Sequence, residues 1–162
     1  MTTTVLMKRR AILAFMLDRP GMLNKIAMLI RRKMYNVETL TVCKTNQPGI
    51  SRMTITLRED SDEKMRQVIK QIEKSTEVIS AKELDMNESF WREVAIVKFE
   101  ADEGRMEALA KTYPFQILDR QNHELFIVQV TGTSLSIDDF LNDVGTDRIV
   151  EVARSGFTAM EK

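Results

Sequence analysis

The apolar residues of this chain mark out an order of segments that then occurs a second time, and no other feature restricts the fold as strongly. The order is strand, helix, strand, strand, helix, strand. Continuous or alternating apolar residues predict the strands, and apolar residues three and four positions apart predict amphipathic helices. The first copy has strands at 11–17, 36–44, 53–57 and 78–84, and helical stripes on Leu23, Ile26, Ala27 and Ile30 and on Met65, Val68, Ile69 and Ile72.

The second copy follows after a short polar stretch. Its third and fourth segments flank a turn that contains Gln121, Asn122 and His123, so they predict a hairpin. The expected strands lie at 94–99, 115–118, 125–130 and 149–153, and the helical stripes are Met106, Leu109, Ala110 and Tyr113, and Ile137, Phe140, Leu141 and Val144.

Several polar residues are suited to end the helices. Asp60 with Glu63 resembles a capping box at the start of the second helix. Ser136 is a candidate N-cap for the last helix, and Gly145 stands just past the end of that helix, where a glycine is favoured.

Each half therefore predicts a βαββαβ plait of the α+β class, with an antiparallel sheet and both helices on one face. The first strand of each half is apolar at nearly every position, so both faces of the sheet should be covered. We expect a homodimer to supply that cover, because halves of about 75 residues bury little of their own surface. The alternative is one α+β domain without an internal repeat.

Composition narrows the classes of function. Among 162 residues, 24 Lys and Arg balance 24 Asp and Glu, which argues against a protein that coats nucleic acid or an anionic membrane. The longest apolar run, 11–17, is far shorter than the roughly 20 residues of a membrane helix. Lys8, Arg9 and Arg10 precede it, but no small-residue cleavage site follows, so we expect no targeting segment and a cytoplasmic protein.

No catalytic constellation emerges from the sequence. His123 has no Ser, Cys or Asp at a triad spacing and is expected to be a solvated turn residue. Cys43, the single cysteine, is expected to be a structural or partly buried thiol. The acidic pairs Asp102-Glu103 and Asp138-Asp139 lie at predicted helix starts, where they favour the helix dipole. We expect no active site, metal site or cofactor in this chain.

One loop has the residues of a small-molecule site. Asp18-Arg19-Pro20-Gly21 joins the first strand to the first helix, and the backbone amides of Gly21 and Met22 would lie at the N-terminus of that helix. Such amides suit a carboxylate, Asp18 suits an ammonium group, and a glycine lets a ligand approach the backbone. A zwitterionic amino acid presents this pair of charges. The alternative is a turn without a ligand.

Longer motifs resemble those of one family, the small regulatory subunits of acetolactate synthase. In the first half the resemblance rests on the Asp-Arg-Pro-Gly-Met-Leu loop, on Tyr35-Asn36-Val37-Glu38-Thr39-Leu40-Thr41-Val42 and on Ser51-Arg52-Met53-Thr54-Ile55. In the second half it rests on Arg92-Glu93-Val94, Val128-Gln129-Val130-Thr131-Gly132-Thr133 and Ile149-Val150-Glu151-Val152-Ala153-Arg154-Ser155-Gly156. The loop alone would indicate only an ACT-type domain, and the closing Val-Ala-Arg-Ser-Gly is much more specific.

The resemblance implies an architecture and a function. It implies two tandem ferredoxin-like domains, which we place at 8–84 (the ACT domain) and 90–162, with a flexible extension at 1–7 and a linker at 85–89. It implies a non-catalytic subunit that activates a large catalytic subunit and mediates feedback by branched-chain amino acids, valine first among them. Thiamine diphosphate, magnesium and FAD would belong to that partner. The alternative is a stand-alone ACT-type amino-acid sensor that controls another enzyme or regulator.

The resemblance also implies an effector site between two protomers. The residues are Asp18, Gly21, Met22, Leu23, Asn36 and Val37, with the amides of Gly21 and Met22 from one chain and Asn36 from the other. Two positions depart from the family pattern. Asp18 stands where valine-sensitive members commonly have Asn, and Met34 stands where many members have Gly. Both departures bear on valine sensitivity.

Overall fold

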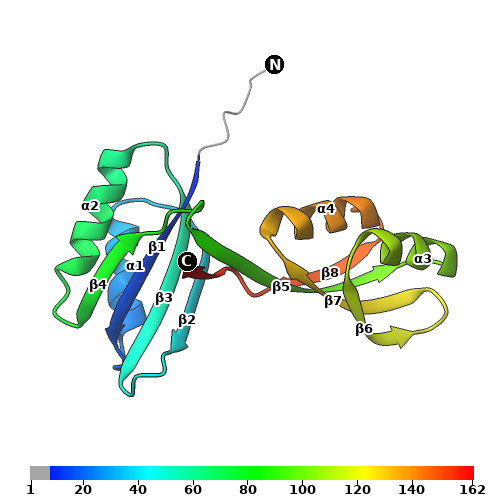
Figure 1. The fold of residues 1–162 in the computed structure, drawn as a ribbon, viewed down its shortest axis with the longest axis horizontal. Helices are drawn as coiled ribbons and strands as arrows, with labels where there is room; N and C mark the ends of the chain where they lie inside the picture. The colour runs from blue at the N-terminus through cyan, green and yellow to red at the C-terminus, as the bar shows by residue number, and fades with distance from the viewer. Residues whose placement is uncertain (1–7) are drawn as a thin grey trace. The chain divides into compact units, whose positions relative to one another are not determined.

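The computed structural model describes residues 8–162, which form two compact α+β units (Figure 1). The second unit is Trp91–Thr158, and the first contains the chain up to Phe90 together with the last four residues, Ala159–Lys162. The predicted extension at 1–7 lies outside the described residues. The predicted linker overlaps the loop at 84–88, but Ser89 already belongs to a strand. The predicted domain boundaries stay predictions.

The first unit has the predicted βαββαβ order. Its antiparallel sheet has the strand order β2-β3-β1-β4, so β1 and β3 are central and β2 and β4 are edges. Both helices cover the same face of this sheet (Figure 1). The elements are β1 (Arg9–Leu17), α1 (Met22–Arg32), β2 (Val37–Lys44), β3 (Ile50–Arg58), α2 (Asp62–Glu73) and β4 (Val78–Glu83).

The core of the first unit lies between the helices and the sheet. Ile12, Ala14 and Met16 alternate along β1 and are at most 1% exposed, together with Met65, Val68 and Ile72 of α2. The predicted stripe of α1 is only half right. Ile26 and Ile30 are buried, whereas Leu23 and Ala27 are exposed on the adjoining side of the helix.

The start of α2 differs by one residue from the prediction. Ser61, not Asp60, is the N-cap, and its hydroxyl accepts from the amide of Lys64 at 3.3 Å. Asp60 instead accepts from the amide of Lys8 at 2.8 Å and holds the start of β1. Glu63 accepts from the side chain of Gln67 and does not close a capping box.

The other face of the first sheet carries no helix and is nevertheless buried at its centre. Ala11 and Leu13 of β1 are 1% and 3% exposed on that face. The end of the chain supplies part of the cover. Arg52 donates a hydrogen bond to the carbonyl oxygen of Ala159, and Lys82 pairs with Glu161 at 2.5 Å. Apolar residues on this face therefore do not by themselves require a second copy, and the homodimer stays a prediction.

The second unit repeats the plait, and its first strand also pairs with a short strand that the sequence pattern did not predict and that lies mostly in the last four residues. Its sheet has the order β6-β7-β5-β8, and β9 also pairs with β5. Strand β5 begins five residues before the predicted segment. The elements are β5 (Ser89–Glu100), α3 (Glu103–Thr112), β6 (Phe115–Gln121), β7 (Leu125–Gly132), α4 (Ser134–Val144), β8 (Ile149–Arg154) and β9 (Thr158–Glu161).

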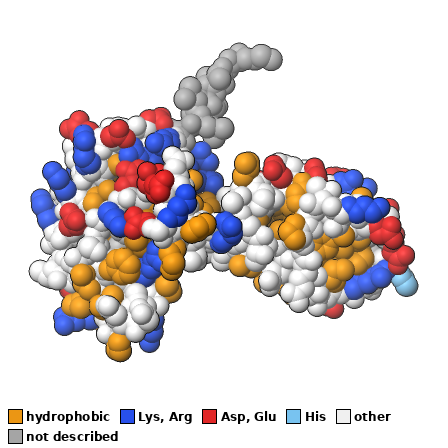
Figure 2. All heavy atoms as spheres, in the orientation of Figure 1, with side chains coloured by type: hydrophobic (Ala, Val, Ile, Leu, Met, Phe, Trp, Pro, Cys, Tyr) orange, Lys and Arg blue, Asp and Glu red, His pale blue; other side chains and the backbone are white. Residues whose placement is uncertain are grey.

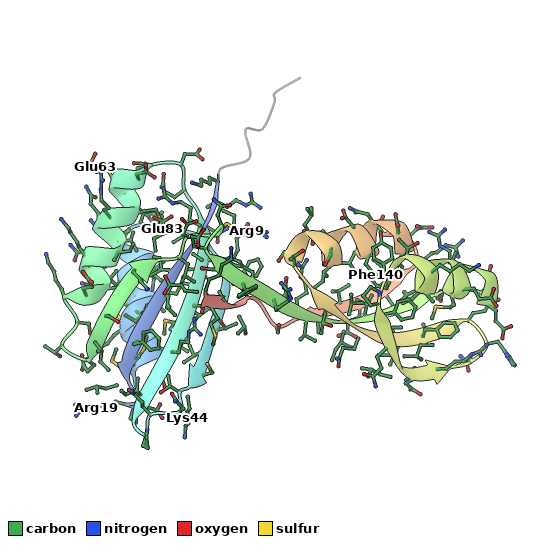
Figure 3. All side chains as sticks on the ribbon, in the orientation of Figure 1. Arg9, Arg19, Lys44, Glu63, Glu83 and Phe140 are labelled. Atoms are coloured by element: carbon green, nitrogen blue, oxygen red, sulfur yellow. The ribbon has the colours of Figure 1, made fainter. Side chains whose placement is uncertain are left out.

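Aromatic rings fill the core of the second unit. Phe140 of α4 is fully buried, and its ring meets those of Phe99 and Tyr113 edge to face, with centroids 6.0 and 5.5 Å apart (Figure 3). Thr133, not the predicted Ser136, is the N-cap of α4 and accepts from the amide of Ser136 at 3.2 Å. Gly145 ends this helix as predicted.

In a single chain the second sheet has one open face, so its cover by a partner chain stays a prediction. Strand β5 alternates strictly, with Ala95 and Val97 buried and Val94 and Ile96 exposed by 37% and 43%. The apolar run in β5 therefore forms a strand with one buried and one exposed face, because side chains along a strand point alternately to opposite faces.

Candidate functional site

The loop between β1 and α1 has the open backbone that the sequence suggested. Gly21 is in the left-handed region at φ 85°, and a Cβ built there would meet no atom within 4 Å. Helix α1 begins at the next residue and has no acidic residue in its first turn. The free space at Gly21 therefore borders the positive end of an 11-residue helix, which favours an anionic group.

The other groups of this loop are partly engaged. The side chain of Met22 is 5% exposed and belongs to the core, so only its backbone can face a ligand. That amide donates a long hydrogen bond of 3.4 Å to the carbonyl oxygen of Arg19. The Asp18 carboxylate lies 3.8 Å from the Lys44 ammonium, whose side chain is 85% exposed. Figure 3 shows Arg19 and Lys44 at the same end of the sheet.

A groove of about 550 Å³ opens on the outer side of α1, beside the edge strand β2. We call it the α1–β2 groove. Its exposed apolar side chains include Leu23 and Leu40, which are 48% and 38% exposed. The full lining is Leu23, Ile26, Ala27, Ile30, Arg31, Met34, Tyr35, Asn36, Val37 and Leu40.

The six predicted site residues fall into two groups. Asp18, Gly21 and Met22 form the loop, whereas Leu23, Asn36 and Val37 line the α1–β2 groove, with Leu23 next to Met22 in the chain. Asn36 is exposed and directly precedes β2. One chain does not test whether two protomers form the predicted site, so this arrangement stays a prediction.

An ion-pair cluster fixes the start of β2, next to Asn36. Glu38 accepts from Arg9 at 2.6 Å and from Arg58 at 2.5 Å. Burial of Glu38 opposes its ionisation, but the hydrogen bonds and charges of the two guanidinium groups outweigh burial and lower the pKa of this carboxyl. The register of β2 against β3 shifts between Val37 and Thr39, on either side of Glu38.

Met34 keeps a backbone conformation that suits glycine. Its φ is 59°, and its side chain is 90% exposed at the α1–β2 groove. The left-handed turn after α1, which L-residues adopt at a cost of about 1–2 kcal/mol, would suit the Gly that the resemblance implies here for many members. The substitution adds an apolar side chain to the groove and leaves the turn in place.

The remaining sequence candidates have structural explanations or no visible role. His123 is exposed in the β6–β7 turn, as predicted (Figure 2). Cys43 is exposed, so the expectation of a partly buried thiol is wrong. Asp102 caps α3 by accepting from the amide of Arg105 at 2.7 Å. Among residues 8–162, no group of His, Cys, Asp and Glu is arranged to hold a metal ion.

The motif Arg154-Ser155-Gly156, which entered the sequence analysis only as a mark of the family, stabilises the second unit through its first two residues. Arg154 makes two hydrogen bonds to the buried carboxylate of Glu93, at 2.9 and 2.7 Å, and a third to Asp138 of α4 at 2.5 Å. The Ser134 hydroxyl donates to Glu93 at 2.6 Å. Ser155, which follows Arg154, makes two hydrogen bonds with the backbone of Val94: its amide donates to the Val94 carbonyl oxygen, and its hydroxyl accepts from the Val94 amide.

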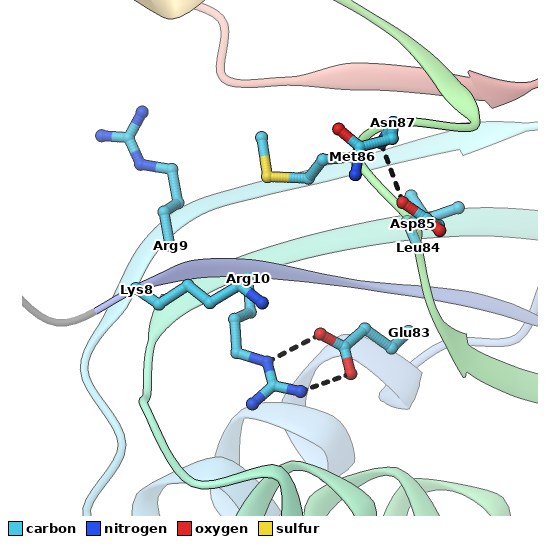
Figure 4. A pocket seen from close by; sticks show the side chains of 8 residues that line it. All are labelled: Lys8, Arg9, Arg10, Glu83, Leu84, Asp85, Met86 and Asn87. Carbon is cyan, nitrogen blue, oxygen red and sulfur yellow. Dashed lines mark hydrogen bonds and ion pairs between the residues drawn. The ribbon is translucent and has the colours of Figure 1, made fainter.

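A cavity of about 640 Å³ lies where β1 begins and β4 ends (Figure 4). Its lining includes Lys8, Arg9 and Arg10, and carboxylates neutralise both arginines. Arg10 forms two hydrogen bonds of 2.7 Å with Glu83 and pairs with Asp62 at 2.8 Å. Arg9, also in the lining, pairs with Glu38. We therefore assign Arg9 and Arg10 a structural role in these ion pairs.

Comparison with known proteins agrees with the two-part fold. A family model described as the AHAS small subunit-like ACT domain matches residues 12–80, and one described as the small subunit of acetolactate synthase matches residues 92–162. The acetolactate synthase isozyme 3 small subunit of Escherichia coli is 36% identical over 159 residues, which cover 95% of this chain and 96% of that protein. This chain belongs to the acetolactate synthase small-subunit family.

Other members of the family extend this finding. The probable acetolactate synthase small subunit of Methanothermobacter thermautotrophicus is 37% identical and covers 89% of this chain and 87% of its own length. A crystal structure of the acetolactate synthase small subunit from Thermotoga maritima has a TM-score of 0.86 at 26% identity, with 96% of this chain and 98% of that chain covered. No helix in residues 8–162 is long and apolar enough to cross a membrane.

Proposed function

We propose that this small-subunit family member is a non-catalytic regulatory subunit. It activates the thiamine-dependent catalytic subunit of acetolactate synthase and mediates feedback by branched-chain amino acids, with valine as the first candidate. The observation that carries the proposal is the match to named small subunits along nearly the whole chain, in both units. Thiamine diphosphate, magnesium and FAD are expected in the catalytic partner.

The effector is proposed to bind at the start of α1. Its carboxylate faces the amides of Gly21 and Met22, where the structure leaves open space and a positive helix end. Its ammonium group faces Asp18 in place of Lys44, whose contact at 3.8 Å is a weak one at an exposed site. The branched side chain lies against Leu23, at the mouth of the α1–β2 groove.

A second copy of the chain is proposed to close this site. Strand β2 is a sheet edge, and unpaired backbone groups on an edge are a template for another strand. Leu23, Met34 and Leu40 expose apolar surface beside that edge. A partner chain on this side covers that surface and brings its Asn36 and Val37 toward the loop.

Reconstitution tests the proposal. Purified catalytic subunit is assayed for acetolactate formation with increasing amounts of this chain. We expect no product from this chain alone and faster product formation by the catalytic subunit in its presence. A catalytic subunit that neither binds this chain nor changes its rate would contradict the proposal and favour a stand-alone amino-acid sensor.

A further inference from the structure

The balanced net charge of the chain hides an uneven distribution between its two units. Lys and Arg outnumber Asp and Glu in the first unit, and the reverse holds in Trp91–Thr158. Helix α1 contains Lys25, Arg31 and Arg32 but no acidic residue, and Lys33 follows it directly. The basic excess is therefore concentrated on one helix of the first unit.

A groove between α1 and α2 collects part of this charge. It has a volume of about 380 Å³ and is lined by Lys25, Ile26, Met28, Leu29, Arg32, Lys33, Gln71, Lys74 and Ser75, with no acidic residue. We call it the α1–α2 groove. It lies on the helical layer, and its lining includes no residue of β2 or of the Asp18–Gly21 loop.

The cations of this groove are mostly unneutralised. Among the groove's cations, only Lys25 has a carboxylate partner within residues 8–162, namely Glu77. Within residues 8–162, Arg32, Lys33 and Lys74 take part in no ion pair, and all three are exposed. This differs from the cavity near Arg10, where the guanidinium groups are matched by Glu38, Glu83 and Asp62.

The surface between these cations is apolar. Met28 is 48% exposed, and Leu29 is half-buried against the core. Met side chains adapt to irregular partner surfaces, and an apolar centre with a charged rim is the usual anatomy of a protein interface. A free phosphate or nucleic acid would use the cations but not the exposed thioether of Met28.

We propose that the α1–α2 groove is the docking surface for the catalytic subunit, which contributes a segment that combines carboxylates with an apolar side chain. This inference rests on the proposed function, because it names the surface through which that partner is held. The apolar side chain covers Met28 and Leu29, and the carboxylates lie against Arg32, Lys33 and Lys74. Charge complementarity of this kind raises the association rate and makes binding depend on salt.

The test is the charge-reversed double variant Arg32→Glu/Lys74→Glu, titrated into the catalytic subunit. Both side chains are exposed and unpaired, so the fold should survive, which circular dichroism checks. We expect the concentration of chain needed for half-maximal activation to rise by 10-fold or more. Wild-type activation should also weaken as NaCl increases from 50 to 300 mM, and the variant should lose most of this salt dependence.

Two matched variants locate the effect. Arg148→Glu reverses one charge, half of the change in the double variant, at an exposed arginine of the second unit that takes part in no ion pair within residues 8–162, and it should leave half-maximal activation unchanged. Met28→Gln removes the apolar contact at constant charge and should weaken activation by about 3- to 10-fold. Direct binding of each variant to the catalytic subunit is measured by calorimetry in parallel.

The outcomes separate this inference from the proposed function. Activation by the double variant at wild-type concentrations would overturn the docking surface and leave the regulatory function standing. A double variant that changes only the sedimentation of the chain would assign the groove to a second copy and also overturn it. A wild-type chain that neither binds nor activates the catalytic subunit would defeat the proposed function itself.

Discussion

Removal of the Arg154 guanidinium tests how the second unit is held together. Arg154→Met keeps the length and apolar stem of the side chain but deletes its two hydrogen bonds to Glu93 and its contact with Asp138. The Glu93 side chain is 2% exposed, so water cannot replace the guanidinium there. The variant therefore leaves a buried carboxylate that retains the Ser134 hydroxyl but loses its bidentate cation.

The size of the effect follows from this geometry. Loss of one partner of a buried ion pair typically costs 3–5 kcal/mol. Arg154 is 30% exposed and Asp138 is 45% exposed, so the contact between these two contributes little. We therefore expect the free energy of unfolding of the second unit to fall by about 3 kcal/mol, at the lower end of that range.

Urea denaturation followed by tryptophan fluorescence measures this loss. Trp91 is the single tryptophan, it is buried in the second unit, and its ring packs edge to face on Phe157 at 5.6 Å. With a slope of about 2 kcal/mol/M, the midpoint should fall by about 1.5 M. The double variant Glu93→Gln/Arg154→Met, which removes the stranded charge, should recover part of the loss.

Two results would refute this reasoning. One is a midpoint for Arg154→Met that lies within about 0.3 M of wild type, which for the same slope is less than about 1 kcal/mol. The other is a double variant that is as unstable as the single one, because the cost would then come from lost packing and not from the buried carboxylate.

Three further predictions concern the first unit. Met34→Gly relieves the strain of a left-handed φ of 59° and removes a side chain that is 90% exposed. The free energy of unfolding should therefore rise by about 1 kcal/mol or less, and the melting temperature by a few degrees. A lower melting temperature would contradict this. Hydrogen bonds from Lys25, Thr76 and Ser75 lower the pKa of Glu77 from 4.5 to about 2. The contribution of the ionised Glu77 to the stability of the fold should therefore be complete above pH 4.5 and disappear toward pH 2. The melting temperatures of wild type and Glu77→Gln should therefore converge in acid, and a gap that is constant with pH would exclude this origin. In calorimetric titration with valine, Gly21→Asp should lower affinity by roughly 100-fold, about 2.7 kcal/mol, through steric and like-charge exclusion, whereas unchanged affinity would place the effector elsewhere.

Local patterns in the sequence predicted the fold well, and the errors have physical causes. All eight strands and four helices of the two plaits lie where apolar periodicity placed them. The N-caps of α2 and α4 were missed because polar candidates stand close together, and only the backbone conformation selects Ser61 over Asp60. Strand β9 has four residues and pairs with β5, which is distant in sequence, so no local signal could reveal it.

Burial was harder to predict than secondary structure. The apolar runs at the centres of β1 and β5 look alike in sequence, yet β1 is buried on both faces and β5 exposes Val94 and Ile96. Covering of the second face depends on segments outside the strand, as Arg52 and Lys82 show by holding the end of the chain. A strand's own residues do not contain that information.

The candidate site was predictable only in part. The Asp18–Gly21 loop carried a recognisable chemical pattern, and the structure leaves open space at Gly21, whose backbone is left-handed. Neither the left-handed backbone at Met34 nor the Glu93–Arg154 network had a signal in composition or periodicity. The pairing of the loop with Asn36 concerns two chains, and it therefore stays a prediction.

We propose that this chain transmits an amino-acid signal to a catalytic subunit through the loop at Gly21. The most direct measurement is acetolactate formation by the reconstituted complex as valine, leucine or isoleucine is added, with wild type and Gly21→Asp compared. We predict that the wild-type complex slows with at least one of these amino acids, whereas the Gly21→Asp complex forms, remains activated and does not respond. An identical response of the two complexes would contradict the site, and a catalytic subunit whose rate is the same with and without this chain would contradict the account as a whole.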